Sequence, residues 1–140
     1  MFVIGSAVTE DRVARILEGG APLRGVATFQ DLYSLLPGNQ ALWFVATDAP
    51  RLFDQANAIG LVALVGAADI SNGLAGTIRL RLATPDMATG VVAMAQAQSA
   101  TAKQIFEDFD VTGEGADVIV RIAMTQSQLD AVLMMLGLVI

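Results

Sequence analysis

The stretch Leu61 to Thr84, LVALVGAADISNGLAGTIRLRLAT, decides the fold. In its second half, apolar residues alternate with small or polar ones at a period of two, which is typical of a strand covered on one side. One face would carry Leu74, Gly76, Ile78, Leu80 and Leu82, and the other would carry Ala75, Thr77, Arg79, Arg81 and Ala83. The preceding apolar run and this strand are therefore predicted to form a β-hairpin.

Two registers of this hairpin are possible. A two-residue Asn-Gly turn would set Ser71 opposite Leu74 and place Asp69 on the apolar face. A three-residue loop with Gly73 in the left-handed conformation would pair Ile70 with Leu74 instead. Because a slip of one residue exchanges the two faces, the hydrophobic pattern favours the three-residue loop. The first strand would then show Val62, Leu64, Gly66, Ala68 and Ile70 on the inner face, and Ala63, Val65, Ala67 and Asp69 on the outer face.

The remaining sequence indicates further strands and helices around the hairpin. Strands are predicted at Phe2–Ala7, Ala41–Thr47 and Ala116–Thr125. Helices are predicted after the capping residues Thr9, Thr28, Asp48, Thr84 and Thr125. The fold class is therefore α+β: a single domain spanning residues 1–140, with a mostly antiparallel sheet of about five strands and helices packed on one face.

The helix after Thr84 is expected to be long. Thr84-Pro85 combines a cap with proline at the first helical position. Apolar residues then recur three and four positions apart, at Met87, Val91, Met94, Ala95, Ala102, Ile105, Phe106 and Phe109. We expect a helix from residue 85 to about 108, lying across the inner face of the hairpin.

Composition excludes several classes of function. The net charge is −6 and the pI is near 4.3, so no electrostatic footprint for nucleic acid is expected. The chain lacks histidine and cysteine, the commonest general base and the usual zinc ligands. No apolar run approaches the roughly 18 residues of a membrane span. Hydrophobic residues make up 54% and charged residues 16%, which indicates either a deeply buried core or apolar surface that a partner covers.

One acidic segment resembles the start of a calcium loop. Asp108, Asp110, Thr112 and Gly113 have the spacing of its positions 1, 3, 5 and 6. The bidentate carboxylate at position 12 is missing, because Ile119 stands there. We interpret residues 110–115 as a solvated loop and predict no metal and no cofactor. Nucleophile and phosphate-binding motifs are also missing, so no catalytic residue is assigned.

The outer face of the sheet is the candidate interaction site. It should present Arg79, Arg81 and Arg121 among Val65 and Ile119, with Trp43 or Val45 beside them, and such a composition is typical of an interface core. The apolar residues Leu138 and Ile140, in the tail that follows the last helix, would add to it. The alternative is an ordinary half-solvated sheet face on which arginine stems lie over small residues.

These patterns favour a non-catalytic protein-interaction or assembly module, with a protein partner or a homo-oligomer. A carrier of a small apolar ligand or lipid is the alternative, because the six methionines could line an adaptable groove, although they could equally fill the core. An enzyme ranks last.

Three segments resemble a known group of proteins. These are Phe2–Leu17, GAADISNGLAGTIRLRLATPDMA at residues 66–88 and VIVRIAMTQSQLDAVL at residues 118–133. They are similar to uncharacterised exported bacterial proteins built of tandem α+β units. The resemblance implies an extracytoplasmic setting and a unit cut from a longer chain, without an activity or site residues. No signal peptide is predicted here, because Met1 is followed directly by apolar residues.

Overall fold

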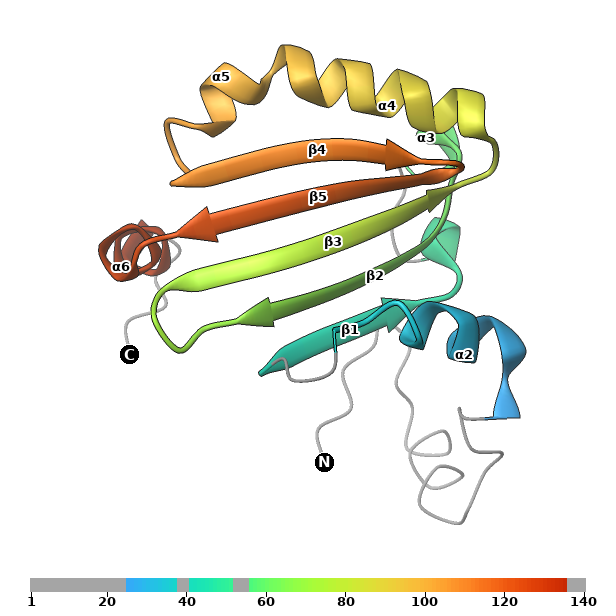
Figure 1. Ribbon diagram of the computed structural model, residues 1–140, viewed down its shortest axis with the longest axis horizontal. Helices are drawn as coiled ribbons and strands as arrows, with labels where there is room; N and C mark the ends of the chain where they lie inside the picture. Colours follow the sequence, from blue (N-terminus) through green and yellow to red (C-terminus); the bar gives the residue numbers. More distant parts are fainter. Residues whose placement is uncertain (1–24, 38–40, 52–55, 136–140) are drawn as a thin grey trace.

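The computed structural model describes residues 25–37, 41–51 and 56–135. The elements in chain order are α2 (Ala27–Tyr33), β1 (Leu42–Ala46), the 3₁₀ turn η2 (Ala49–Arg51), α3 (Ala56–Ile59), β2 (Leu61–Asp69), β3 (Leu74–Leu82), α4 (Pro85–Ala97), α5 (Ser99–Ala102), β4 (Asp108–Glu114), β5 (Asp117–Met124) and α6 (Gln126–Met135). The strands form one antiparallel sheet in the order β1-β2-β3-β5-β4, with β1 and β4 at opposite edges (Figure 1). The predicted single α+β domain with an antiparallel sheet of five strands is confirmed.

The β2–β3 hairpin has the predicted register. Asp69 pairs with Ala75 and Val65 pairs with Arg79, as the three-residue loop requires. Gly73 has a φ of +100°, in the left-handed region that glycine tolerates best. A bulge between Leu61 and Ala63 shifts the register at the start of β2.

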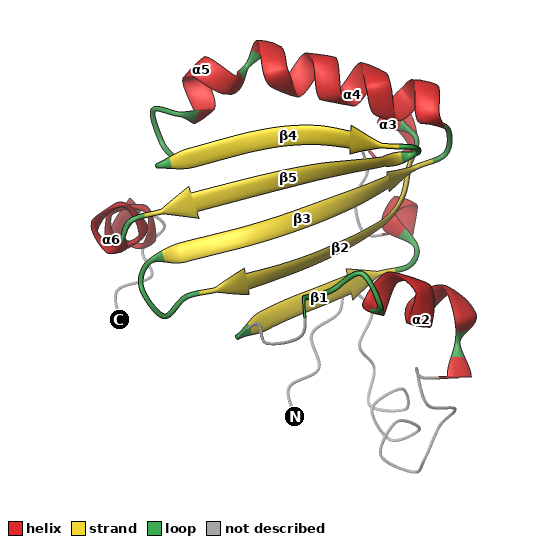
Figure 2. Cartoon of the chain, in the orientation of Figure 1, coloured by secondary structure: helices red, strands yellow, loops and turns green. Residues whose placement is uncertain are grey.

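The main core lies between the inner face of the sheet and α4. Its buried residues include Leu64, Leu82, Val111 and Val118, and Ala88 of α4 is also buried there. Val91, Val92 and Ala95 continue the packed stripe of α4 against this core. The helix runs along β4, and β5 is the next strand of the sheet (Figure 2). The small residues Ala88 and Ala95 let the helix approach the strands closely.

A second, smaller core lies on the outer face. Leu32 of α2 is buried against Ala63 and Val65, and Leu36 and Val45 pack around them. Helices therefore cover both faces of the sheet, and the expectation that they pack on one face holds for α4 but not for α2. Because β2 is buried on both faces, it reads as a near-continuous apolar run. The helix α2 starts at Ala27, so its N-cap is Val26 and not the predicted Thr28.

The long helix is shorter than predicted. It begins as expected, with the Thr84 hydroxyl accepting a hydrogen bond from the backbone N–H of Met87, but α4 ends at Ala97 and the short α5 follows. The predicted loop at residues 110–115 was also wrong, because β4 occupies Asp108–Glu114. Phe109 and Val111 alternate onto the inner face and pack in the core, while the backbone of β4 pairs with β5. This pairing satisfies the main-chain groups of the acidic segment that face β5.

Other predicted elements are confirmed in part. Thr125 and Gln128 form the capping box, with the Thr125 N–H bonded to Gln128 Oε1 at 2.9 Å and the Gln128 N–H bonded to Thr125 Oγ1 at 3.3 Å. The helix predicted after Asp48 consists of η2 and α3, on either side of residues 52–55, which lie outside the described residues. The predicted strand Phe2–Ala7 and the helix after Thr9 also lie outside the described residues. Among the described residues, the fifth strand of the sheet is β4, which was not predicted as a strand.

Candidate interaction surface

The outer face brings the predicted site residues together in rows across the strands. Val65 of β2, Arg79 of β3 and Ile119 of β5 are neighbours in one row. Thr77 and Arg121 are paired in the next row, which begins with Trp43 of β1. Val65 and Ile119 are buried, so they pack within the protein and present little surface to a partner.

Arg79 and Arg81 bind carboxylates of the same chain. Asp117 of β5 accepts two hydrogen bonds from Arg81, from Nε to Oδ1 at 2.9 Å and from Nη2 to Oδ2 at 3.0 Å. Arg79 Nη1 donates to Asp117 Oδ2 at 3.1 Å and to Glu114 Oε2 at 2.8 Å. The four residues form one network that connects β3 with β5 and the end of β4, and we call it the Asp117 cluster.

Asp117 is the buried member of this cluster, with 7% of its surface exposed. The hydrogen bonds from Arg81 lower the pKa of its carboxyl group below the ordinary value; burial opposes this effect, and Arg79 adds to it. Burial works against the charged form of Arg79, but the bonds to Glu114 and Asp117 outweigh it, so the pKa of Arg79 is raised. The Asp117 carboxylate is therefore ionised at neutral pH and is compensated by the two guanidinium groups.

Arg121 is more weakly held. Its Nη1 lies 3.3 Å from Asp110 Oδ2, and both side chains are half-exposed. Exposed ion pairs of this kind contribute little to stability, because water screens them.

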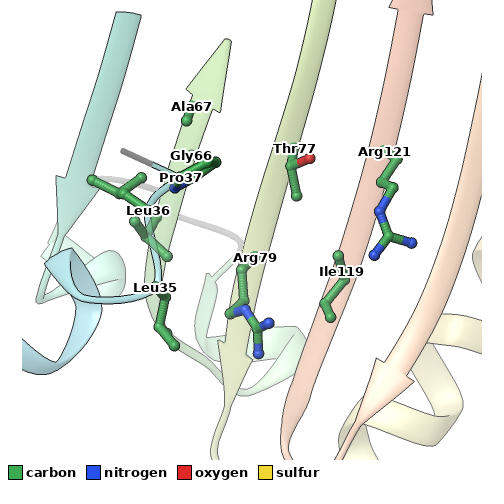
Figure 3. A pocket seen from close by; sticks show the side chains of 10 residues that line it. Leu35, Leu36, Pro37, Gly66, Ala67, Thr77, Arg79, Ile119 and Arg121 are labelled. Carbon is green, nitrogen blue, oxygen red and sulfur yellow. The ribbon is translucent and has the colours of Figure 1, made fainter. Parts of the chain in front are cut away.

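A small cavity lies on this face beneath the segment that follows α2. It has a volume of about 140 Å³ and is lined by Leu35, Leu36, Pro37, Val65, Gly66, Ala67, Thr77, Arg79, Ile119 and Arg121. Figure 3 shows Leu35 and Leu36 beside β2, with the guanidinium groups of Arg79 and Arg121 on β3 and β5. The segment therefore covers part of the surface that the sequence suggested for a partner.

Several large aromatic and aliphatic side chains are exposed on β1 and on the helix α2 beside it. Leu42 is 54% exposed, Trp43 52% and Phe44 44%, and Tyr33 of α2 is 48% exposed. The rings of Trp43 and Tyr33 meet edge to face, with their centroids 5.3 Å apart. We call these four residues the β1 patch.

Sequence reasoning identified only Trp43 of this patch. Leu42 and Phe44 lie in the same run, ALWFVAT, which predicted the strand correctly. Their exposure follows from the position of β1 at the edge of the sheet, and strand order is a tertiary property that the run itself does not contain.

Further exposed apolar residues lie away from the sheet. Met134 and Met135 are exposed at the end of α6, and Met94 is exposed on α4. Met124, in contrast, is buried on β5. Met1 and the predicted site residues Leu138 and Ile140 lie outside the described residues.

The described part of the chain holds neither a candidate metal site nor a candidate membrane-spanning helix. It contains no group of three or more histidine, cysteine, aspartate or glutamate residues that could hold a metal ion. None of its helices is both long and apolar enough to cross a membrane. Comparison with protein-family models, with curated proteins and with solved structures gives no match.

Proposed function

We propose that this protein is a non-catalytic protein-interaction or assembly module that binds its partner through the β1 patch. The observation that carries the proposal is the half-exposure of Tyr33, Leu42, Trp43 and Phe44 around a single strand. Tyrosine, tryptophan and phenylalanine are enriched in the cores of protein interfaces, where their large surfaces lose contact with water.

The Asp117 cluster supports a structural role for two of the predicted interface arginines. Arg79 and Arg81 already donate hydrogen bonds to Asp117 and Glu114 within the chain. A partner that recruited them would have to break these bonds. The proposed contact area is therefore centred on β1, at the edge of the outer face, and Trp43 is the member of the predicted site that belongs to it.

A carrier of a lipid or another apolar ligand receives less support. Pockets for small ligands usually enclose about 300–1,000 Å³, whereas the cavity beneath Leu35 and Leu36 measures about 140 Å³. Two arginines and Thr77 line it as well, which makes part of its wall polar. This geometry favours an interaction module over a carrier.

Site-specific crosslinking tests the proposal. A photoreactive amino acid replaces Trp43 in the full chain, and the chain is irradiated in cells that produce it. We expect covalent adducts between position 43 and a protein that mass spectrometry identifies. The matched control places the same amino acid at Ala93, which is exposed on α4 far from β1 along the fold. Equal yields of the same adducts at both positions, or no protein adduct at position 43, would contradict the proposal.

A further inference from the structure

The two edges of the sheet differ in a way that bears on association. Strands β1 and β4 each have one neighbouring strand in the sheet of the described residues, so each leaves a row of main-chain N–H and C=O groups without a strand partner there. An edge of this kind is a template for another strand unless charges or prolines protect it.

In the described part of the chain, charged residues protect the β4 edge, whereas the strand β1 has no such residues. Asp108, Asp110 and Glu114 place three exposed carboxylates along β4. The strand β1, LWFVA, contains neither a charged residue nor a proline. Among the described residues, therefore, one edge of the sheet carries charged side chains, whereas the other carries none and can accept an added strand.

The exposed side chains of β1 indicate what kind of partner fits. Leu42 and Phe44 lie on the inner face, in register with Ala68 and Gly66, whereas Trp43 lies on the outer face in register with Ala67. A helix or surface that docks on one face would cover only one of these sets. A strand added at the edge continues both faces and contacts all three residues.

We propose that the occupant is the β1 strand of a second copy of this chain, paired antiparallel about a two-fold axis. This inference rests on the proposed function and names the partner of the same patch. An isologous contact requires a surface that complements itself. Because β1 carries no charge, two copies can meet there without repulsion between like charges, although each chain has a net charge of −6.

Symmetry defines the register of this pairing. Directly paired residues of antiparallel strands point to the same face, and the two-fold axis keeps inner face beside inner face. Full overlap of the five residues of β1 is obtained when the axis passes Phe44. Phe44 then faces Phe44 of the second copy, Trp43 faces Val45, and Leu42 faces Ala46. The two sheets become one continuous sheet in which the β4 edges lie at the far ends.

Sedimentation velocity over a series of concentrations tests the association. We expect the unmodified chain to pass from monomer to dimer as its concentration rises. Leu42→Lys and Trp43→Lys should keep it monomeric, because each places a lysine on the pairing edge. Thr112→Lys is the matched control: it adds the same charge at an exposed position of the opposite edge strand, and the dimer should persist. Circular dichroism checks that each variant is folded.

Single cysteines test the register, since the chain has none of its own. With the axis at Phe44, two copies of Phe44→Cys place their Cβ atoms about 5 Å apart, within reach of a short thiol crosslinker. Two copies of Leu42→Cys are four residues out of register and therefore about 14 Å apart. We expect crosslinked dimer for Phe44→Cys and monomer for Leu42→Cys.

The outcomes separate this inference from the proposed function. A chain that stays monomeric at every concentration, a dimer that both lysine variants leave unchanged, or equal crosslinking at positions 42 and 44 would overturn the β1–β1 pairing. If position 43 nevertheless crosslinks to a different protein in cells, the proposed function stands and only the identity of the partner is wrong. If position 43 crosslinks to no protein, both are wrong.

Discussion

At the scale of single residues, Asp117 determines what the outer face can do. A buried carboxylate is costly unless hydrogen bonds and opposite charges compensate it. Here Arg81 supplies a bidentate contact, and Arg79 supplies a further one while also binding Glu114. Both arginines therefore bind carboxylates within the chain, and the exposed side chains available for contact are the uncharged residues at β1.

Replacing Asp117 by asparagine should lower the free energy of unfolding by about 1.5–3 kcal/mol, the usual value of hydrogen bonds to a charged group. Because pairing lowers the folded-state pKa below the ordinary value of 3.8, the contribution of the carboxylate is fully present above that pH. It is lost as the pH falls through the lowered folded-state pKa. Urea unfolding between pH 7 and pH 2 should therefore show that the unmodified chain is more stable than Asp117→Asn at neutral pH, and that this difference in the free energy of unfolding disappears in acid.

Asp110→Asn is the control for this measurement. It removes the partner of Arg121 in a half-exposed pair, and such pairs contribute about 0–1 kcal/mol. A loss as large as that of Asp117→Asn, or a difference for Asp117→Asn that is independent of pH, would contradict the assignment of Asp117 as the centre of the cluster.

The sequence placed these residues on the right face without revealing their contacts. Period-two alternation put Arg79 and Arg81 on the outer side of their strand, as observed, and Asp117 lies on the same side of β5. Their pairing depends on β5 lying beside β3, and this strand order results from how α4 leads the chain across the sheet. Alternation within a strand carries no information about its neighbours.

At the scale of elements, the hairpin was predictable and β4 was not. The hairpin register follows from two apolar faces that a one-residue slip would exchange. Just before and at the start of β4, the spacing of Ile105, Phe106 and Phe109 also fits a helix, so the pattern of α4 could be extended too far. Backbone pairing with β5 and the packing of Phe109 and Val111 override this local pattern.

Two glycines test the local backbone geometry. Gly73→Ala should destabilise the fold by about 1–3 kcal/mol, because its φ of +100° is unfavourable for a side chain and the added Cβ would collide with the backbone oxygen of Met124. Gly90→Ala should instead stabilise it by about 0.5–1 kcal/mol, since its position in α4 has open space around it. Urea unfolding at neutral pH measures both. Equal effects of the two substitutions would argue against the hairpin loop described here.

At the scale of the whole molecule, composition and structure agree on a chain with much apolar surface. Low charge content indicated either a deep core or apolar surface, and both occur: β2 is buried on two faces, while the apolar β1 patch is exposed. The hydrophobic fraction of 54% could not distinguish between them, because it carries no information about position.

Association through β1 should make thermal stability depend on protein concentration. A second copy that binds the folded state and not the unfolded one shifts the unfolding equilibrium. We therefore expect the Tm of the unmodified chain to rise between about 5 µM and 500 µM, a range chosen to span weak association. Differential scanning calorimetry measures this change. A constant Tm for the unmodified chain, or the same rise in Trp43→Lys, would contradict it.

The strand order also has a consequence for how the chain folds. The hairpins β2–β3 and β4–β5 each close over a short loop, so their contacts are local and can form quickly. The seam between β3 and β5 joins residues such as Arg81 and Asp117, which are 36 positions apart in the sequence. Closing it orders the chain through α4 and α5 at the same time. The Asp117 cluster lies on this seam and would therefore become fully bonded only when the two hairpins dock.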